Sequence, residues 1–538
     1  MANNLPFELL SQIAAYLHAD DYPLAAYTVV CRHWQTAFES FIYSNLTVYS
    51  ETVEDPEAYE DKIEVHSKLR EIWNTATFKY PSRPAWSRDD QNAKKSRKPL
   101  SLSLFTTLTS GANATRRAWI RHLKYKVVVP FLIEDWKAIK GQHYNYKNPT
   151  REENNKAFQS GVIRLFEILK SWSQTHRLSL ELGLFGREVC GEPDTNGQSH
   201  AGDYDWDYTN GRTTAVQPYR ARFLDDSLKF PSALCVDRLL FLNGADREGG
   251  NRNHRIWAST IFEIVVHCPT LTELDLDLDE YIRPDHEGLI KQRRQDVAEG
   301  LKRLPDTLRV FRYKNQTELN WKETMPALNV LPPSGTDALS INLQALSFRL
   351  RELNVEQTAL SLDFLCPLNR DLKPIGDLSS LYWPHLEILN FELVPRFTPS
   401  GEWLFHYTAE LQAEVAAIDD WNAEICDLER GWSYRELINY DDFHRLFASM
   451  GYAAQRMPRL SQINFVGDFE SESTFHFVYD SSTAVFTATW ESYSEYQPND
   501  QVASAWGFRL EDTEDDEMSR DYGAITSTVR FPMWPPHR

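Results

Sequence analysis

One alternation of apolar and polar positions recurs along the chain beyond residue 100. It has the form Leu-x-x-Leu-x-Leu, with other aliphatic or aromatic residues in some copies, and its last part has the two-residue period of a half-buried strand. The copies are Ile120, Leu123, Tyr125; Leu178, Leu180, Leu182 in degenerate form; Val236, Leu239, Phe241; Leu271, Leu274, Leu276; Leu308, Phe311, Tyr313; Leu350, Leu353, Val355; Leu386, Leu389, Phe391; and Leu460, Ile463, Phe465. The pattern predicts a series of short strands.

Helical patterns fill the intervals, and proline introduces four of the strands. Proline ends the preceding helix and cannot donate to a strand ladder, so it fixes where the strand begins. Helix, proline and short strand in repetition predict an irregular leucine-rich-repeat-like α/β solenoid over residues 100–470. An ordinary α/β domain with several parallel strands is the alternative. The predicted helices are Phe158–Trp172, Ile256–His267, Gly288–Arg303, Leu404–Leu428 and Phe443–Met450, and the prolines are Pro269, Pro305, Pro384 and Pro458.

The outward positions of these strands would line the concave face of such a solenoid. Most of them are acidic or carry an amide, which favours a client surface that is basic or rich in hydrogen-bond donors. A solvated sheet face has the same composition. The candidate client-binding residues are Glu273, Asp275, Asp277, Arg312, Lys314, Glu352, Asn354, Glu356, Asn390 and Glu392, followed by Gln462 and Asn464.

The pattern changes near residue 471. Thr474–Tyr479 and Ala484–Trp490 alternate strongly and are separated by a polar turn, so they predict a β-hairpin, to which Val502–Leu510 adds a third strand. Glu511–Asp521 is acidic, and the Pro-rich end Phe531–Arg538 is expected to be extended. Residues 471–538 are therefore predicted to form an antiparallel flap with an acidic, Pro-rich tail, covering the last sheet edge.

The first fifty residues predict three short helices. Leu9, Ile13 and Leu17 recur at helical spacing after Pro6, a second helix contains Leu24, and a third contains Trp34. Three short helices in about forty residues bury too little apolar area to be stable alone. They must pack on the rest of the chain, as a helical cap of the repeats, or on a partner.

The order and spacing of these residues resemble the F-box motif. Leu5-Pro6-x-Glu8-Leu9, the later aliphatic positions and Val30-Cys31-Arg32-His33-Trp34 carry the resemblance. It implies that residues 1–50 bind the adaptor Skp1, and through it a cullin–RING ubiquitin ligase, with catalysis left to the recruited conjugating enzyme. The implied Skp1-binding residues are Leu5, Pro6, Leu9, Ile13, Leu17, Leu24, Val30, Cys31 and Trp34. A short F-box before long irregular repeats looks like a group of F-box proteins of filamentous fungi.

Charge and cysteine content narrow the class of partner. The 538 residues carry a net charge of −20, which disfavours binding to nucleic acid or to a membrane surface. The six cysteines lie far apart and form no CxxC pair, which is typical of reduced thiols in the cytosol or nucleus. The start lacks the basic and apolar regions of a signal peptide. Residues 51–99 are predicted to be a helical and linker segment, whose basic run Lys94–Lys98 could be a nuclear localisation signal.

Sequence patterns for catalysis or for a bound cofactor or metal are lacking. We find no phosphate loop, no GxGxxG after a strand, no GxSxG elbow and no HExxH, so we predict a protein that is not an enzyme and uses no cofactor or metal. His122, His267 and His385 adjoin apolar strand or helix ends, where a structural role is expected. The alternating Asp203, Asp205 and Asp207 lack an EF-hand context and predict an exposed loop. Two alternatives remain: a Skp1-binding scaffold without a ubiquitination client, and a hydrolase hidden in the repeats.

Overall fold

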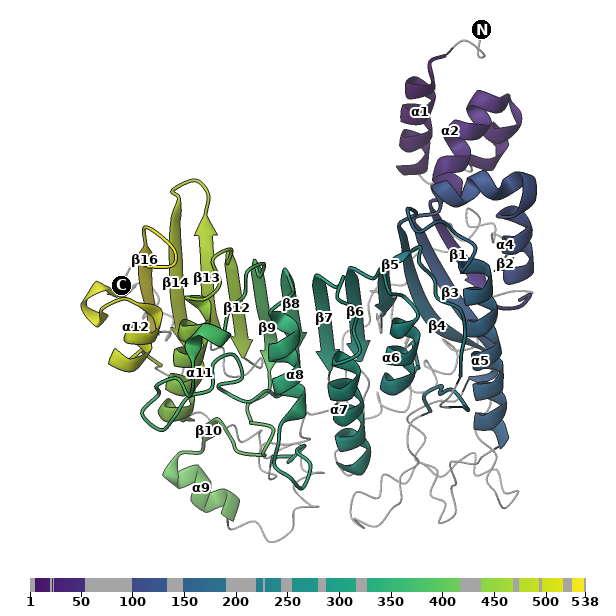
Figure 1. Ribbon diagram of the computed structural model, residues 1–538. Coiled ribbons are helices and arrows are strands. Elements are labelled where there is room, and N and C mark those ends of the chain that lie inside the picture. The colour runs from purple at the N-terminus through teal and green to yellow at the C-terminus, as the bar shows by residue number, and fades with distance from the viewer. Residues whose placement is uncertain are drawn as a thin grey trace, which may run out of the picture.

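The computed structural model describes residues 5–19, 22, 24–53, 99–132, 149–189, 219–225, 228–242, 254–278, 287–315, 327–416, 437–467, 474–492, 496–515 and 525–536. Within these ranges the chain is a mixed α/β fold on one large, mostly parallel sheet, with an N-terminal helical module at one end (Figure 1). The predicted helical and linker segment at 51–99, apart from residues 51–53 and 99, and the predicted loop with Asp203, Asp205 and Asp207 lie outside the described residues. No described helix has the length and apolar character needed to cross a membrane.

The three predicted N-terminal helices are present. They are α1 (Phe7–Ala19), the 3₁₀ helix η2 (Leu24–Val29) and α2 (Arg32–Ile42). Leu10 and Ala14 of α1 pack with Leu24 and Phe38 in a small core of their own, against which the Trp34 ring also packs. This core is separate from the main one, so the module has only a few residues to hold it together.

Within the described ranges the sheet has 14 strands in the order β15-β16-β14-β13-β12-β9-β8-β7-β6-β5-β4-β3-β1-β2. From β2 to β12 all neighbours pair in parallel, and each of the strands from β3 to β9 lies beside the next one in the chain. The parallel strands are β1 (Asn45–Tyr49), β2 (Leu100–Ser101), β3 (His122–Leu132), β4 (Leu178–Val189), β5 (Val236–Phe241), β6 (Glu273–Leu278), β7 (Val310–Asn315), β8 (Glu352–Glu356), β9 (Ile388–Val394) and β12 (Gln462–Gly467).

All eight predicted copies of the apolar pattern are strands, β3 to β9 and β12. Their central apolar residues lie in one register, so that Leu274 of β6 is opposite Phe311 of β7, which is opposite Leu353 of β8. These side chains point to the helical side of the sheet and are buried. The prediction of a mixed α/β fold with short strands is confirmed.

The longer described helices lie along one face of the sheet (Figure 1). Their apolar residues and the inner strand residues form one continuous core. The helices are α5 (Pro149–Leu169), α6 (Ala258–Val266), α7 (Glu287–Leu301), α8 (Ala338–Ser347) and α11 (Tyr440–Ala454). Shorter elements are α4 (Leu102–Leu108), η4 (Gly111–Trp119), η5 (Leu378–Ser380), α9 (Ala409–Ala416), α12 (Asp500–Trp506), η7 (Leu510–Asp512) and the pair β10 (Phe405–His406) and β11 (Leu437–Ile438).

The predicted C-terminal hairpin is confirmed. Strands β13 (Thr474–Asp480) and β14 (Val485–Ser492) pair antiparallel, and β13 continues the sheet from β12. The third strand was predicted wrongly, because residues 500–506 form helix α12, which packs on α11 and whose Trp506 donates a hydrogen bond to the Phe447 carbonyl at 2.9 Å. The strand that pairs with β14 is β16 (Ile525–Phe531), next to the short β15 (Glu514–Asp515).

Two other sequence predictions differ from the structure. The helix predicted from Leu404 begins only at Ala409, because Phe405–His406 pairs with Leu437–Ile438; residues beyond 416 there are not described. Strand β1 lies within the predicted residues 1–50 of the helical module, but pairs with β3 and belongs to the sheet. The chain passes from module to sheet near Ser44.

Candidate functional site

The N-terminal module exposes apolar side chains to an unusual degree. Seven of the nineteen large exposed apolar residues in the described part of the chain fall between residues 7 and 30. We call these seven the docking face: Phe7, Leu9, Ile13, Tyr16, Tyr22, Val29 and Val30. Val29 is 83% exposed and Tyr16 is 70% exposed, so water contacts most of each side chain. Exposed apolar residues gathered in one small module are typical of an interaction site.

Helix α1 contributes four of the seven docking-face residues, because it carries two apolar stripes. Leu10, Ala14 and Leu17 follow helical spacing and pack in the core of the module. Leu9, Ile13 and Tyr16 follow the same spacing one position earlier and remain exposed. The helix is therefore apolar over a wider arc than its own module covers.

The residues implied by the F-box resemblance divide between these two environments. Leu9, Ile13 and Val30 are 44%, 37% and 47% exposed and belong to the docking face. Leu24, in contrast, is 5% exposed and lies in the module's own core. Pro6 is exposed, and the half-buried residues are Leu5, Leu17, Cys31 and Trp34. The sequence interpretation missed Phe7, Tyr16, Tyr22 and Val29, although the second stripe of α1 was visible in the spacing.

A short, well-bonded junction joins the helical module to the sheet. Only two residues separate α2 from β1, and the Ser44 carbonyl accepts hydrogen bonds from the backbone N–H groups of Arg121 and His122 at 3.0 and 2.9 Å. The Tyr43 ring stacks on Trp119 with 6.4 Å between ring centroids. The orientation of the module relative to the sheet is therefore set by bonded and packed groups.

The second candidate surface is the open face, which we define as the side of β6–β9 and β12 opposite the helices. Every predicted client-binding residue lies on it, because buried and half-buried residues alternate along these strands. The register brings five predicted residues into one row across neighbouring strands. The row consists of Asp275, Arg312, Asn354, Asn390 and Asn464.

Negative charge predominates on the open face. The Arg312 guanidinium lies 2.8 Å from Glu352, 3.7 Å from Glu273 and 4.0 Å from Asp275. Arg238 of β5 lies 3.4 Å from Glu273, so two cations serve three carboxylates. Burial raises the pKa of Asp275 above its ordinary value, although Arg312 and Arg238 act in the opposite direction. Partial burial of this carboxylate therefore makes its ionised form costly.

Three amide oxygens on β8, on β9 and directly after β8 accept no hydrogen bond from the described residues. They are Oδ1 of Asn354, Oδ1 of Asn390 and Oε1 of Gln357, each shielded from solvent. Asn354 uses its amide N–H to donate to Glu352 at 2.8 Å, so only its oxygen is left over. The surface therefore offers more hydrogen-bond acceptors than it satisfies.

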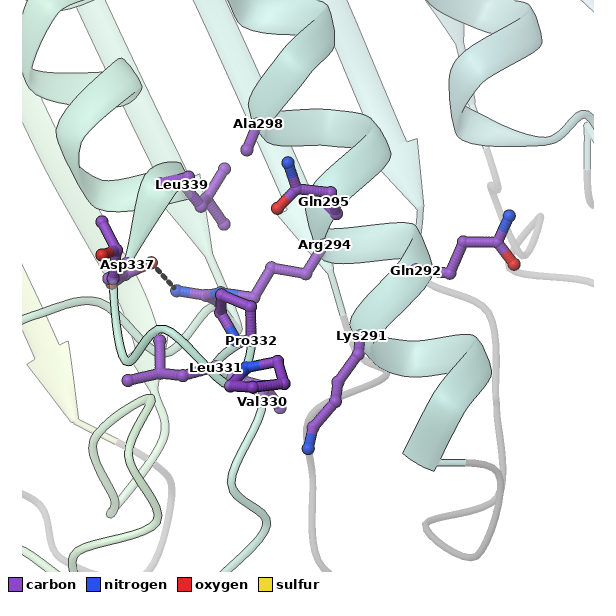
Figure 2. A pocket seen from close by; sticks show the side chains of 13 residues that line it. Lys291, Gln292, Arg294, Gln295, Ala298, Val330, Leu331, Pro332, Asp337 and Leu339 are labelled. Atoms are coloured by element: carbon purple, nitrogen blue, oxygen red, sulfur yellow. Dashed lines mark hydrogen bonds and ion pairs between the residues drawn. The ribbon is translucent and has the colours of Figure 1, made fainter.

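A cavity of about 290 Å³ lies between α7 and the segment that precedes α8. Figure 2 shows Arg294 of α7 reaching toward Asp337, with Val330, Leu331 and Leu339 around the pair. The ion pair is 2.8 Å long and nearly inaccessible, and Asp337 also accepts hydrogen bonds from Ser340 and Ser361. Since the charges satisfy each other and the walls are largely apolar, the arrangement has a structural role.

The described cysteines and histidines show no reactive arrangement. Burial raises the pKa of Cys235 and of Cys366 to about 12, so both thiols are protonated at neutral pH. His267 stacks on Phe230 with 3.8 Å between ring centroids, and burial lowers its pKa. Among the described residues no three His, Cys, Asp or Glu side chains converge as a metal site would require.

Comparison with known proteins adds no family to this description: no protein-family model and no curated protein matches the sequence.

Proposed function

We propose that this chain is the substrate-recruiting subunit of an SCF-type ubiquitin ligase. Its N-terminal module would bind Skp1, and its leucine-rich-repeat-like region would hold a protein client near the conjugating enzyme. The observation that carries the proposal is the exposure of Leu9, Ile13 and Val30, since all three are positions of the F-box resemblance. A role in the cytosol or nucleus follows from the same proposal.

The burial pattern favours a docking module over a helical cap. A cap would cover its apolar residues with the sheet, whereas the docking face remains accessible and the module contacts the sheet domain mainly through α2 and η4. Complete burial of an aliphatic or aromatic side chain stabilises by about 1.5–3 kcal/mol. Burial of several half-exposed ones on a partner would therefore contribute favourable free energy, which opposes the cost of association.

The strand order supports a leucine-rich-repeat-like region. Successive strands from β3 to β9 are neighbours in the sheet, with α5–α8 on one face. In a repeat protein each unit contacts only the next, so strand order follows chain order. The open face is then available for a client, and the module at one end of the sheet is available for the adaptor (Figure 1).

The test is coexpression of the full chain with Skp1, followed by size-exclusion chromatography. We expect the two proteins to elute together, and the double variant Ile13→Asp, Val30→Asp to elute apart from Skp1. Ile341→Asp is the matched control, because Ile341 is an isoleucine on α8 with 53% exposure. Separate elution of the unmodified chain would overturn the proposal.

A cellular comparison distinguishes a ligase subunit from a Skp1-binding scaffold. Cells that carry the Ile13→Asp, Val30→Asp chain should accumulate the client, because client and ligase are no longer held together. Quantitative proteomics against cells with the Ile341→Asp chain would show this. If no protein accumulates, the scaffold alternative is favoured.

A further inference from the structure

The open face has the dimensions of an extended peptide binding site. Its central row runs from Asp275 on β6 through Arg312, Asn354 and Asn390 to Asn464 on β12. Neighbouring strands lie about 4.8 Å apart, so the row is about 19 Å long. An extended chain advances about 3.3 Å per residue, and about six residues would span the row.

The excess of negative charge at the β6 end of the row favours a cationic ligand. Arg312 is shared among Glu273, Asp275 and Glu352, and Arg238 of β5 also pairs with Glu273. Two cations for three carboxylates leave an excess of negative charge. Glu392 of β9 is exposed and lies opposite Glu356 of β8, so the open face carries further negative charge beyond this cluster. A ligand lysine or arginine near Asp275 would compensate a carboxylate that burial otherwise penalises.

The side-chain oxygens of the asparagines in the middle of the row favour a ligand that donates hydrogen bonds. Oδ1 of Asn354 and Oδ1 of Asn390 are shielded from solvent and have no partner among the described residues. The last side-chain torsion of asparagine is broad, so rotation can turn the Asn390 oxygen outward, and can turn that of Asn354 outward in exchange for its hydrogen bond to Glu352. The backbone N–H groups of an extended peptide are donors that would reach such a row regardless of side chain.

We infer that the open face of β6–β9 and β12 binds an extended, cationic peptide segment of about six residues. Its lysine or arginine side chains lie near Glu273 and Asp275, and its backbone N–H groups donate to Asn354 and Asn390. The inference rests on the proposed function only in treating this segment as part of a client. The peptide site is separate from the docking face, so each can be tested without the other.

Fluorescence anisotropy with synthetic peptides tests the inference on the full chain without Skp1. The probes are three fluorescein-labelled ten-residue peptides of Gly, Ser and Ala that carry no lysine, two lysines or four lysines. We expect affinity to increase about tenfold from the first to the last, and to decrease with salt. Equal affinity for all three peptides would overturn the inference.

Three variants locate the binding. Glu273→Gln, Asp275→Asn should weaken the four-lysine peptide about tenfold and leave the uncharged peptide unchanged. Asn390→Ala should weaken every peptide alike, because it removes a contact to the backbone. Glu299→Gln, on the helical side of the sheet with a 51% exposed side chain, is the matched control. If the open-face variants bind like the control, the peptide does not bind there.

Competition with spermine separates a peptide site from a site for small cations. Spermine carries four positive charges but no peptide backbone, so it should displace the four-lysine peptide poorly at equal concentration. Displacement as efficient as that by unlabelled peptide would overturn the peptide assignment. Coelution of the Glu273→Gln, Asp275→Asn variant with Skp1 is expected to be unchanged, so failure of the peptide site and failure of the proposed function remain distinguishable.

Discussion

Arg116 holds Glu39 by two hydrogen bonds across the junction between the helical module and the sheet. Its Nη2 donates to Oε1 of Glu39 at 2.8 Å and its Nε donates to Oε2 at 3.4 Å. The two residues are 77 positions apart in sequence, and their side chains are only 16% and 10% exposed. The Arg116 guanidinium also lies 5.1 Å from the centre of the Tyr43 ring. One side chain thus connects η4 to both α2 and the residue that follows it.

We expect Arg116→Ala to destabilise the chain by roughly 1–3 kcal/mol, because the shielded Glu39 carboxylate then keeps only the Gln35 amide as a side-chain donor and loses its compensating charge. Urea denaturation followed by tryptophan fluorescence measures this. Arg509→Ala is the control, because Arg509 and Glu511 form an ion pair whose side chains are 79% and 71% exposed, and its loss should cost less than about 1 kcal/mol. Equal effects of both variants would mean that the junction does not depend on Arg116.

The strands and their outward residues could be predicted from the sequence. A two-residue alternation specifies both the strand and its buried face, so Leu274 and Leu276 are buried while Asp275 is not. The same local rule places every predicted client-binding residue on the open face. Such patterns encode which side of the sheet a residue occupies, but not which hydrogen bonds it makes there.

Packing between distant segments limits what the sequence reveals. Residues 502–510 alternate enough to suggest a strand, but Val502 and Trp506 are buried in helix α12, which packs on α11. Asn499 before this helix and Gly507 after it, with φ of 83°, are start and stop signals that the sequence does contain. Burial of Leu24 likewise depends on contact with α1 and α2, which no local pattern specifies.

Asp275→Asn is expected to stabilise the fold at neutral pH. Burial raises the pKa of Asp275 above 3.8, so the folded chain holds this proton over a pH range in which the unfolded chain has released it. Stability then falls as pH rises through that range, and the neutral asparagine avoids the loss. Urea unfolding across acid to neutral pH should show the variant's advantage growing from the ordinary aspartate pKa upward and reaching its full size above the raised pKa. A variant less stable than the unmodified chain at neutral pH would contradict this.

Asp337→Asn, unlike Asp275→Asn, is expected to destabilise the fold at neutral pH. Burial alone would raise the pKa of Asp337, but Arg294 and the Ser340 and Ser361 hydroxyls lower it below 3.8 overall. Its contribution to stability is therefore present above 3.8 and is lost as pH falls through the lower folded value. The variant removes the Asp337 charge from beside the buried Arg294 guanidinium, at a cost of about 3–5 kcal/mol near neutral pH.

Urea unfolding near pH 7 and at acid pH measures the effect of Asp337→Asn. The difference from the unmodified chain should shrink as the solution becomes more acidic than the ordinary aspartate pKa. Glu299→Gln, at an exposed position on α7, should show no such trend. A constant difference at all pH values would indicate that lost packing, rather than lost charge, explains the variant.

Substitution of two neighbouring leucines in α1 should distinguish the stability of the module from its binding to Skp1. Leu10 is 1% exposed in the module core, so Leu10→Ala should cost about 2–5 kcal/mol and increase amide hydrogen exchange over residues 7–42. Leu9 is 44% exposed, so Leu9→Ala should change stability by less than about 0.5 kcal/mol. Coelution with Skp1 should nevertheless be weakened by Leu9→Ala. Unchanged coelution would remove Leu9 from the docking face.

Substitution of alanine for each of two glycines in helix α7 should change the stability of the chain in opposite directions. A Cβ built on Gly300 would lie 2.1 Å from ring atoms of Phe262 on α6, whereas one on Gly288 meets nothing within 4 Å. Gly288→Ala should therefore stabilise the chain by about 0.4–1 kcal/mol, because alanine restricts the unfolded chain more than glycine does. At Gly300 that gain is outweighed by the displacement of Phe262, since overpacking costs typically about 1–3 kcal/mol. Thermal unfolding should show a higher midpoint temperature for Gly288→Ala and a lower one for Gly300→Ala than for the unmodified chain. Stabilisation by Gly300→Ala would mean that α6 and α7 are farther apart than the structure places them.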